Sequence, residues 1–398
     1  MARRADSARL RGRSYLDCMR RVFFWAHLLT GLTIGVVVLL MAATGVLLTY
    51  QRQIQYRADT RGLDVTPPAA SAQPLAPAEL LTRVRAQTDA PITGIRWRRG
   101  ADAPVELLSG RERVLFADGY TGIVLGEGSR RTREFFRAVT GLHRWLALRD
   151  VKSGRAITGA ANLAFLFMVC SGLYLWWPRR PSRRAFRNAM LFRRGLRAKA
   201  RDFNWHTVIG FWSSLPLLAI IASAVVTSYA WAGVLIERVA GSTSAAPAAV
   251  AGGAPTVESG RELDLGAQML ERARATVPEW KSITLELPVR RGAAVFIIDT
   301  GTGGQPHRQA RLTLAAASGD VVAWQPFSSG ARAARVREVL RYLHTGEVAG
   351  IPGQTVAGLV SAGVTVLVIT GASLALRRLA AWRRRRARAV APDGAGLP

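Results

Sequence analysis

Residues 22–50 read VFFWAHLLTGLTIGVVVLLMAATGVLLTY, and no Asp, Glu, Lys or Arg interrupts this stretch. About 20 apolar residues in an α-helix cross the hydrocarbon core of a bilayer, so the stretch is long enough to span it. It is too long for the apolar part of a signal peptide, and no small-residue cleavage site follows, so we expect a retained anchor. Further apolar runs lie at 157–177, 206–236 and 355–376. The sequence therefore predicts an all-α, four-helix transmembrane bundle.

The chain of 398 residues has a formal net charge of +29, and much of this charge lies beside the apolar runs. Arginine-rich blocks occupy residues 1–21, residues 178–201 and the tail from Arg377. Lysine and arginine next to spanning helices are typical of cytoplasmic loops. Both termini are therefore predicted to be cytoplasmic. The long segment after the first apolar run and the long segment after the third are predicted to lie outside. No DNA- or RNA-recognition motif accompanies the arginines, which argues against nucleic acid as a partner.

Both outer segments carry the signals of small α+β domains. The first has a Pro/Ala-rich linker, a helical stretch AELLTRVRAQ and β-rich runs such as ITGIRWRR; the second has STSAAPAAVAGGAP, ELDLGAQMLERARATV and SITLELP. Glycine-containing turns at 118–122 and 318–320 separate β-rich runs, which favours hairpins. In chain order, the predicted parts are a basic N-terminus at 1–21, helix 1 at 22–50, outer domain 1 at 51–140, an interfacial segment at 141–156, helix 2 at 157–177, a basic loop at 178–203, helix 3 at 204–236, outer domain 2 at 237–340, an interfacial segment at 341–353, helix 4 at 354–376 and a basic tail at 377–398.

The chain contains an internal repeat, since each half reads helix, outer domain, helix. The matched positions are Trp25 and His27 with Trp205 and His206, Gly31 with Gly210, Tyr50 with Tyr229, His143 with His344, and Ser171-Gly172 with Thr370-Gly371. Each half therefore has one histidine near the start of its first helix and another before its second helix.

Four of the five histidines lie at a predicted membrane boundary, one for each spanning helix. His27 and His206 form an inner pair, and His143 and His344 form an outer pair. Ionisable residues inside a membrane are costly and usually functional. Two imidazoles that face each other across helices can ligate a haem iron axially, whereas zinc prefers four clustered ligands. The sequence thus predicts two b-type haems, one near each membrane face, and gives His307 no role.

Gly31 and Gly210 each lie one helical turn beyond an inner histidine, on the same face of the helix. The missing side chain leaves a flat macrocycle room against the backbone, so both glycines are candidate cofactor-binding residues. Close helix–helix packing is the alternative explanation for such glycines. For the histidines, the alternative is an interfacial position or a helix cap without any ligand.

The chain resembles the bacterial PepSY-associated transmembrane proteins (PepSY_TM), which are often described as iron-regulated membrane proteins. The matching stretches are WAHLLTGLTIG, VLFADGYTGIVLGE, GLHRWLAL, FNWHTVIGFW and YLHTGEVAGIPGQ, in this order over nearly the whole chain. The turn at 118–122 resembles the Asp-x-x-Thr-Gly hairpin of PepSY domains, and residues 317–320 keep part of it. The resemblance implies that both outer domains are PepSY-like and periplasmic, in a multi-pass protein of the bacterial inner (cytoplasmic) membrane.

Some members of this family are di-haem reductases of ferric siderophores, and their ligating histidines correspond to His27, His206, His143 and His344. The resemblance therefore implies electron transfer from the cytoplasmic side to a periplasmic ferric siderophore or another ferric chelate, for iron acquisition. Basic residues before the outer pair are candidates to attract an anionic chelate, and a solvated or headgroup-binding face is the alternative explanation. These residues are Arg130, Arg131, Arg133 and Arg137.

The sequence lacks an electron-donating domain, because no Gly-x-Gly-x-x-Gly follows a strand and the inner loops are too short for a flavin or nicotinamide domain. The donor would then be a quinol or a separate cytoplasmic reductase. A second hypothesis is a non-enzymatic membrane protein whose PepSY-like domains bind a peptide, a protease or a siderophore. A third is a siderophore permease, for which a homodimer would enlarge the path.

Overall fold

A computed structural model describes residues 2–69, 71–110, 113–179, 181–241, 267–289, 292–316 and 318–390. The predicted linker at 242–255 and the end of the predicted basic tail lie outside these residues. The chain folds as two compact units. The helical unit contains the residues up to 49, residues 138–229 and the residues from 355 onward; the sheet unit contains residues 50–137 and 230–354.

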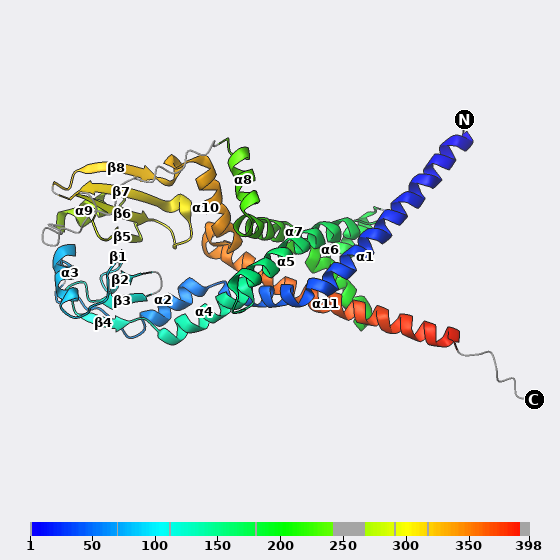
Figure 1. Cartoon of the computed structure of the whole chain (residues 1–398), viewed down its shortest axis with the longest axis horizontal. Helices are drawn as coiled ribbons and strands as arrows, with labels where there is room; N and C mark the ends of the chain where they lie inside the picture. Colours follow the sequence, from blue (N-terminus) through cyan, green and yellow to red (C-terminus); the bar gives the residue numbers. More distant parts are fainter. Residues whose placement is uncertain are drawn as a thin grey trace, which may run out of the picture. The chain divides into compact units, whose positions relative to one another are not determined.

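Four long helices make up most of the helical unit (Figure 1). They are α1 (Ala2–Leu48), α5 (Val151–Trp176), α7 (Ala198–Ser228) and α11 (Gly350–Val390). Within the described residues, the segments Asp17–Leu48, Val151–Trp176, Ala198–Ser228 and Glu347–Arg386 are long and apolar enough to cross a membrane. Large apolar side chains are exposed along them, for example Val36 (71%) and Leu215 (79%). Exposed apolar side chains suit helices whose surroundings are lipid, and the predicted set of four spanning helices is confirmed.

Small residues let these helices pack closely. The helix α5 packs against both α1 and α7. The helix α11 approaches α1 at Gly358, where a Cβ would lie 2.8 Å from the Thr49 hydroxyl oxygen, and approaches α7 at Gly363, where a Cβ would lie 3.1 Å from an Ile209 methyl carbon. Glycines that allow such close approach are typical of helix packing in membranes. The bundle is therefore closed by α11 against α1 and α7.

Several helix ends differ from the prediction, and local backbone geometry accounts for the end of helix 3 and the start of helix 4. Helix 3, predicted at 204–236, begins at Ala198 and ends at Ser228, since Tyr229 adopts an extended conformation. The apolar residues beyond it form a separate helix, α8 (Ala230–Val239), which belongs to the sheet unit. Pro352 lies in the first turn of α11. Proline is tolerated there, because the first-turn N–H groups have no partner within the helix.

The predicted interfacial segment 141–156 contains a tight corner between α4 (Arg130–Trp145) and α5. Leu146 and Ala147 both have positive φ angles, of 55° and 52°. This left-handed region costs a non-glycine residue roughly 1–2 kcal/mol. A Cβ at Gly154 would lie 2.3 Å from the Trp145 carbonyl oxygen, so α5 lies directly against the end of α4. The corner therefore combines close packing at Gly154 with a disfavoured backbone conformation at Leu146 and Ala147.

We expect Ala147→Gly to stabilise the helical unit by about 0.5–1 kcal/mol, because glycine adopts a positive φ at no steric cost. The measurement is the melting temperature of the purified protein in detergent. The matched control is Ala156→Gly, in the exposed and regular part of α5, which should lower stability by about 1 kcal/mol. A lower melting temperature for both variants would contradict the assignment of strain to residue 147.

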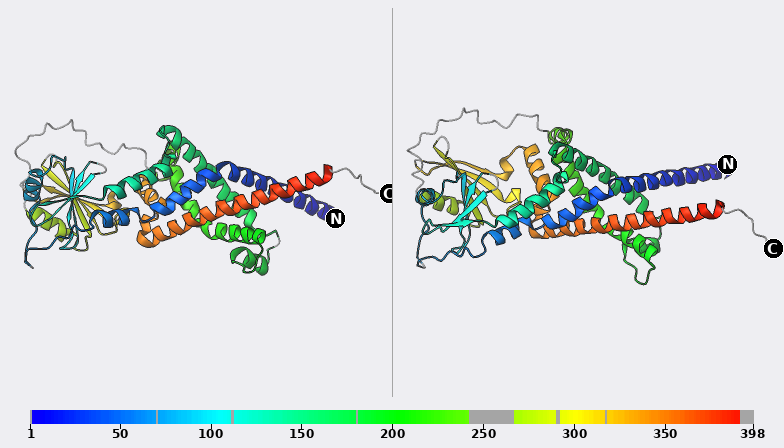
Figure 2. Two further views of the ribbon diagram at one scale, coloured as in Figure 1. Left: turned by 90° about the horizontal axis from the view of Figure 1, so that it is seen from below. Right: turned by 60° about the horizontal axis from the view of Figure 1, so that its bottom comes forward.

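A single antiparallel sheet forms the centre of the sheet unit, in the order β4-β3-β2-β1-β5-β6-β7-β8. Its strands are β1 (Gly94–Arg98), β2 (Val105–Ser109), β3 (Arg113–Ala117), β4 (Val124–Glu127), β5 (Ser282–Glu286), β6 (Ala293–Asp299), β7 (Gln309–Ala315) and β8 (Val321–Pro326). The remaining elements are α2 (Gln51–Asp59), α3 (Pro77–Arg85), α9 (Ala267–Thr276), α10 (Arg332–His344) and the short 3₁₀ helices η1 (Pro306–Arg308), η2 (Phe327–Ser329) and η3 (Glu347–Ala349). Successive strands are rotated relative to one another (Figure 2), as the twist of β-sheets requires.

The two outer segments, predicted as two separate domains, share this one sheet and one core. Strand β1 pairs with β5 from Gly94 opposite Glu286 to Arg98 opposite Ser282. The core draws buried side chains from α3, from α9 and from strands of both segments. Each four-stranded meander alone would leave β1 or β5 as an open edge with unpaired backbone groups. Pairing these edges satisfies those groups and merges the two predicted domains into one.

Candidate functional site

His27 lies on α1 and contacts a serine of α5. Its Nδ1 is 2.9 Å from the Ser171 hydroxyl oxygen, and that hydroxyl donates to the carbonyl oxygen of Met168 at 3.2 Å. When a serine hydroxyl gives its single hydrogen to a carbonyl oxygen, it accepts from an imidazole Nδ1–H. The Nε2 atom then carries the lone pair, which is the form in which a histidine ligates a metal. A Cβ at Gly172 would lie 3.4 Å from the Cε1 atom of His27, so this glycine leaves room for the ring.

His206 on α7 repeats this arrangement with α11. Its Nδ1 is 3.1 Å from the Thr370 hydroxyl oxygen, and that hydroxyl donates to the carbonyl oxygen of Val366 at 2.8 Å. When the threonine hydroxyl gives its single hydrogen to that carbonyl, the imidazole hydrogen lies on Nδ1 and the lone pair on Nε2. Gly371 again follows the hydroxyl residue, and a Cβ there would lie 3.2 Å from the Cε1 atom of His206.

His143, in the last turn of α4, has the same kind of partner on α1. Its Nδ1 is 2.9 Å from the Thr44 hydroxyl oxygen, which donates to the carbonyl oxygen of Leu40 at 2.6 Å. A Cβ at Gly45 would lie 3.7 Å from the Cε1 atom of His143. Three histidines therefore each face a Ser/Thr-Gly dipeptide on a neighbouring helix. Sequence reasoning noted two of these dipeptides as matched positions without a role and missed Thr44-Gly45, although the recurring dipeptide was the available signal.

His27 on α1 and His206 on α7 both belong to the helical unit, and in each of them Nδ1, not Nε2, makes the hydroxyl contact. Their predicted role as ligands of one haem stays a prediction. Within the described residues, no group of three or more His, Cys, Asp or Glu could hold a metal ion.

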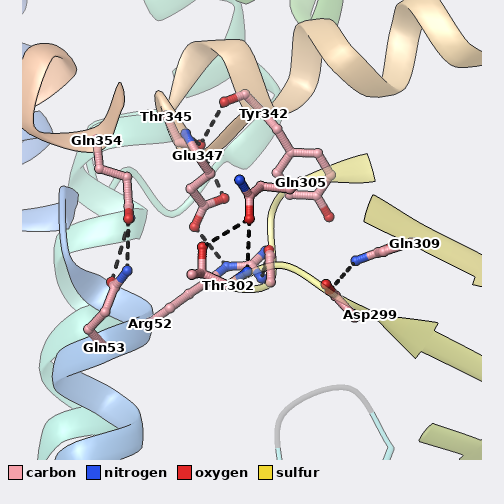
Figure 3. A network of polar contacts seen from close by, with 11 residues as sticks. Arg52, Gln53, Asp299, Thr302, Gln305, Gln309, Tyr342, Thr345, Glu347 and Gln354 are labelled. Carbon is pink, nitrogen blue, oxygen red and sulfur yellow. Dashed lines mark hydrogen bonds and ion pairs between the residues drawn. The ribbon is translucent and has the colours of Figure 1, made fainter. Parts of the chain in front are cut away.

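His344 is the last residue of α10, in the sheet unit, and is followed by a tightly held corner (Figure 3). Gly346 has a φ of 75°, and Glu347 forms an ion pair with Arg52 at 2.8 Å. Arg52 also donates to the carbonyl oxygen of Gly303 at 3.0 Å. The backbone after His344 is therefore fixed by an ion pair to α2 and by the loop after β6. The predicted pairing of His344 with His143 stays a prediction.

Gly31 and Gly210 lie against side chains of the neighbouring helices. A Cβ at Gly31 would lie 2.9 Å from the terminal methyl carbon of Met168, and a Cβ at Gly210 would lie 3.7 Å from a methyl carbon of Leu367. These contacts are those of close helix packing. The flexible methionine side chain can vacate its position at small cost, so the predicted contact of Gly31 with a cofactor stays a prediction.

Two of the four arginines predicted to attract an anionic chelate are engaged by carboxylates. Arg130 forms an ion pair with Glu134 one turn later, at 2.7 Å. Arg133 forms an ion pair with the buried Asp59. Burial raises the pKa of the Asp59 carboxyl, and the charge of Arg133 opposes this change. Arg133 therefore holds α2 to α4 within the sheet unit, and its charge is less available to a ligand.

Comparison with known proteins places the chain in a family. The family model described as PepSY-associated TM region matches residues 24–378, which is nearly the whole chain. No curated protein matches significantly. The match includes two of the spanning segments entirely, most of the other two, the sheet unit and every histidine discussed above. The chain therefore belongs to the PepSY-associated transmembrane family.

Proposed function

We propose that this protein is a di-haem b electron-transfer protein of the bacterial inner membrane, which passes electrons to a periplasmic ferric chelate such as a ferric siderophore. The observation that carries the proposal is the state of the inner histidines. The Nδ1 atoms of His27 and His206 each lie within hydrogen-bonding distance of a hydroxyl group that also donates to a backbone carbonyl oxygen. A hydrogen bond of this kind orients a ligating imidazole and raises its basicity.

The residues present fit haem in their chemistry. A haem supplies one-electron oxidation and reduction of its iron, with a potential set by its axial ligands and their hydrogen bonds. His27 and His206 would hold the inner haem through Nε2. The outer haem would be held by His143 and His344, a pairing that rests on the sequence repeat and on the family resemblance. Ser171 and Thr370 contact the Nδ1 atoms of the inner imidazoles, and Thr44 contacts that of His143, so each hydroxyl would orient its ring.

The direction of electron flow follows from the charge distribution. The arginines at both termini and in the 178–201 loop favour a cytoplasmic position for the helix ends that carry His27 and His206. Electrons would then enter near the inner pair, from a quinol or a cytoplasmic reductase, because the chain has no nucleotide-binding motif of its own. Reduction of the ferric chelate outside would weaken the chelate and release iron.

We further propose that the sheet unit consists of two PepSY-like halves and that the whole chain is an internal repeat. Each half contributes one helix and a four-stranded meander in the same order. In the first half, the Asp118 carboxylate accepts from the backbone N–H of Tyr120 at 2.7 Å, and Gly122 has a φ of 75°. These features account for the aspartate and the glycine of the Asp-x-x-Thr-Gly hairpin, since the turn needs a side-chain acceptor and a left-handed residue.

The test is the visible absorption spectrum of the full-length protein, expressed with haem supplied and purified in detergent. We expect a Soret band with the spectrum of low-spin, six-coordinate haem and about two haems per chain by pyridine haemochrome assay. Dithionite should reduce both haems, and a ferric siderophore added afterwards should reoxidise them. Protein without a Soret band would instead support the alternative of a non-enzymatic membrane protein that binds a peptide, a protease or a siderophore.

Thr370→Val should reveal whether the hydroxyl positions His206. Valine keeps the shape of threonine but cannot accept the Nδ1–H, so we expect haem affinity at the inner site to fall by about tenfold and one midpoint potential to shift. Redox titration measures the potentials, and Thr370→Ser should restore them. The control is Thr365→Val on the same helix, whose hydroxyl donates to the Ser361 carbonyl oxygen of that helix at 3.2 Å. Identical potentials in all three variants would show that the hydroxyl has no such role.

A further inference from the structure

The basic loop between α5 and α7 has a defined structure. It contains α6 (Arg183–Met190) and then turns back onto α7. The side chain of Asn204, only 6% exposed, accepts from the backbone N–H of Arg193 at 3.0 Å and donates to the carbonyl oxygen of Leu191 at 3.2 Å. A buried amide that holds both sides of the turn fixes its backbone. The residues that follow Leu191 are therefore held in place against α7.

A cavity of about 690 Å³ lies between this turn and α7. Its lining includes Phe192, Arg193, Arg194, Arg201, Trp205 and Ile209, and no Asp or Glu lines it. It therefore has a cationic part and an apolar part. Arg201 is partly neutralised by Asp202 at 3.2 Å and lies 6.0 Å from the centre of the Trp205 ring. Within the described part of the chain, the guanidinium groups of Arg193 and Arg194 form no ion pair.

Tryptophans around the cavity place it at the headgroup level of the bilayer. Trp212 on α7 is 60% exposed, and its indole N–H donates to the carbonyl oxygen of Met190 at 2.9 Å. Trp176 at the end of α5 donates in the same way to Ala189 at 3.2 Å. Trp205 is 42% exposed. Tryptophan with an apolar body and a bonded N–H is typical of the membrane–water interface.

We propose that this cavity binds the phosphodiester of an anionic phospholipid headgroup. Arginine forms two parallel hydrogen bonds to a phosphate group, and Arg193 and Arg194 have no carboxylate partner to give up. Basic pockets between membrane helices on the cytoplasmic side bind such headgroups. The apolar side of the cavity, Trp205 and Ile209, suits the glycerol and the start of an acyl chain, which a free phosphate compound lacks. The proposal does not depend on haem binding.

The experiment measures the lipids that remain bound to the full-length protein. Protein in mild detergent is incubated with an equal mixture of phosphatidylglycerol and phosphatidylcholine, and native mass spectrometry counts the retained molecules. We expect phosphatidylglycerol to be retained preferentially. The triple variant Arg193→Gln/Arg194→Gln/Arg201→Gln should retain at least about tenfold less, since each arginine near an anionic surface contributes measurably to binding. The single variant Arg194→Gln should retain an intermediate amount, and it serves if the triple variant fails to fold.

The control variant Arg383→Gln/Arg384→Gln/Arg385→Gln makes the same change of charge in the exposed part of α11 and should retain phosphatidylglycerol like the wild type. Equal loss in both triple variants would show an effect of net charge alone and overturn the proposal. So would equal retention of the two lipids by the wild type. In a separate arm, delipidated protein receives inorganic phosphate before the lipid. Displacement of phosphatidylglycerol by phosphate would assign the cavity to a free phosphate-bearing molecule and overturn the lipid assignment.

Discussion

His27→Ala is expected to remove one of two haems and so to lower the haem content of the purified protein by about half. Alanine deletes a proposed axial ligand, and the α5 side chain in contact with His27 is the Ser171 hydroxyl. A hydroxyl is a poor ligand for haem iron compared with imidazole. The haem-to-protein ratio by pyridine haemochrome assay measures the loss. His206→Ala should give the same result, because both residues are proposed to serve one cofactor.

Double variants separate the two proposed pairs. The variant His27→Ala/His206→Ala should lose no more haem than either single variant, whereas His27→Ala/His143→Ala should lose nearly all of it, because residues that share one ligand are not additive. His307→Ala is the matched control, since His307 is the fifth histidine and is exposed in the sheet unit. A full second loss in the first double variant would overturn the pairing of His27 with His206.

Gly346→Ala is expected to destabilise the protein by about 3 kcal/mol or more, as is typical of substitutions that force backbone atoms apart. Gly346 has a φ of 75°, and a Cβ there would lie 2.2 Å from the Gly353 carbonyl oxygen. The left-handed conformation alone accounts for roughly 1–2 kcal/mol, and the overlap with backbone adds the rest. Gly346 comes shortly after His344, so the outer haem should also be lost where the inner one persists.

The control for this substitution is Gly62→Ala, in the same unit. Gly62 has a φ of 77°, yet nothing lies within 4 Å of a Cβ there. It should therefore show only the conformational cost of roughly 1–2 kcal/mol. Thermal unfolding in detergent, followed by circular dichroism, compares the two variants. Equal melting temperatures would contradict a rigid corner after His344.

Some of the candidate site was accessible from the sequence. The inner pair is a prediction from the positions of His27 and His206 in helices proposed to be equivalent, because a repeat places equivalent residues at equivalent depths. The hydroxyl partners were not accessible, since Ser171 and Thr370 are far from their histidines along the chain. The sequence of one helix does not show which neighbouring helix its side chains will contact. The role of Met168 beside Gly31 was hidden for the same reason.

The sequence by itself determined the four spanning helices, because a bilayer demands a long apolar run in which every backbone group bonds within its own helix. It also determined that each outer segment contains a helix and several strands. Only the tertiary structure decided that β1 pairs with β5 and that both segments form one sheet. The edge strands of the two meanders expose unpaired backbone N–H and C=O groups. These groups do not depend on the residue type, so the sequence pattern does not identify the strand with which an edge will pair. The hydroxyl partner of each bonded histidine was likewise decided by packing, because another helix supplies it.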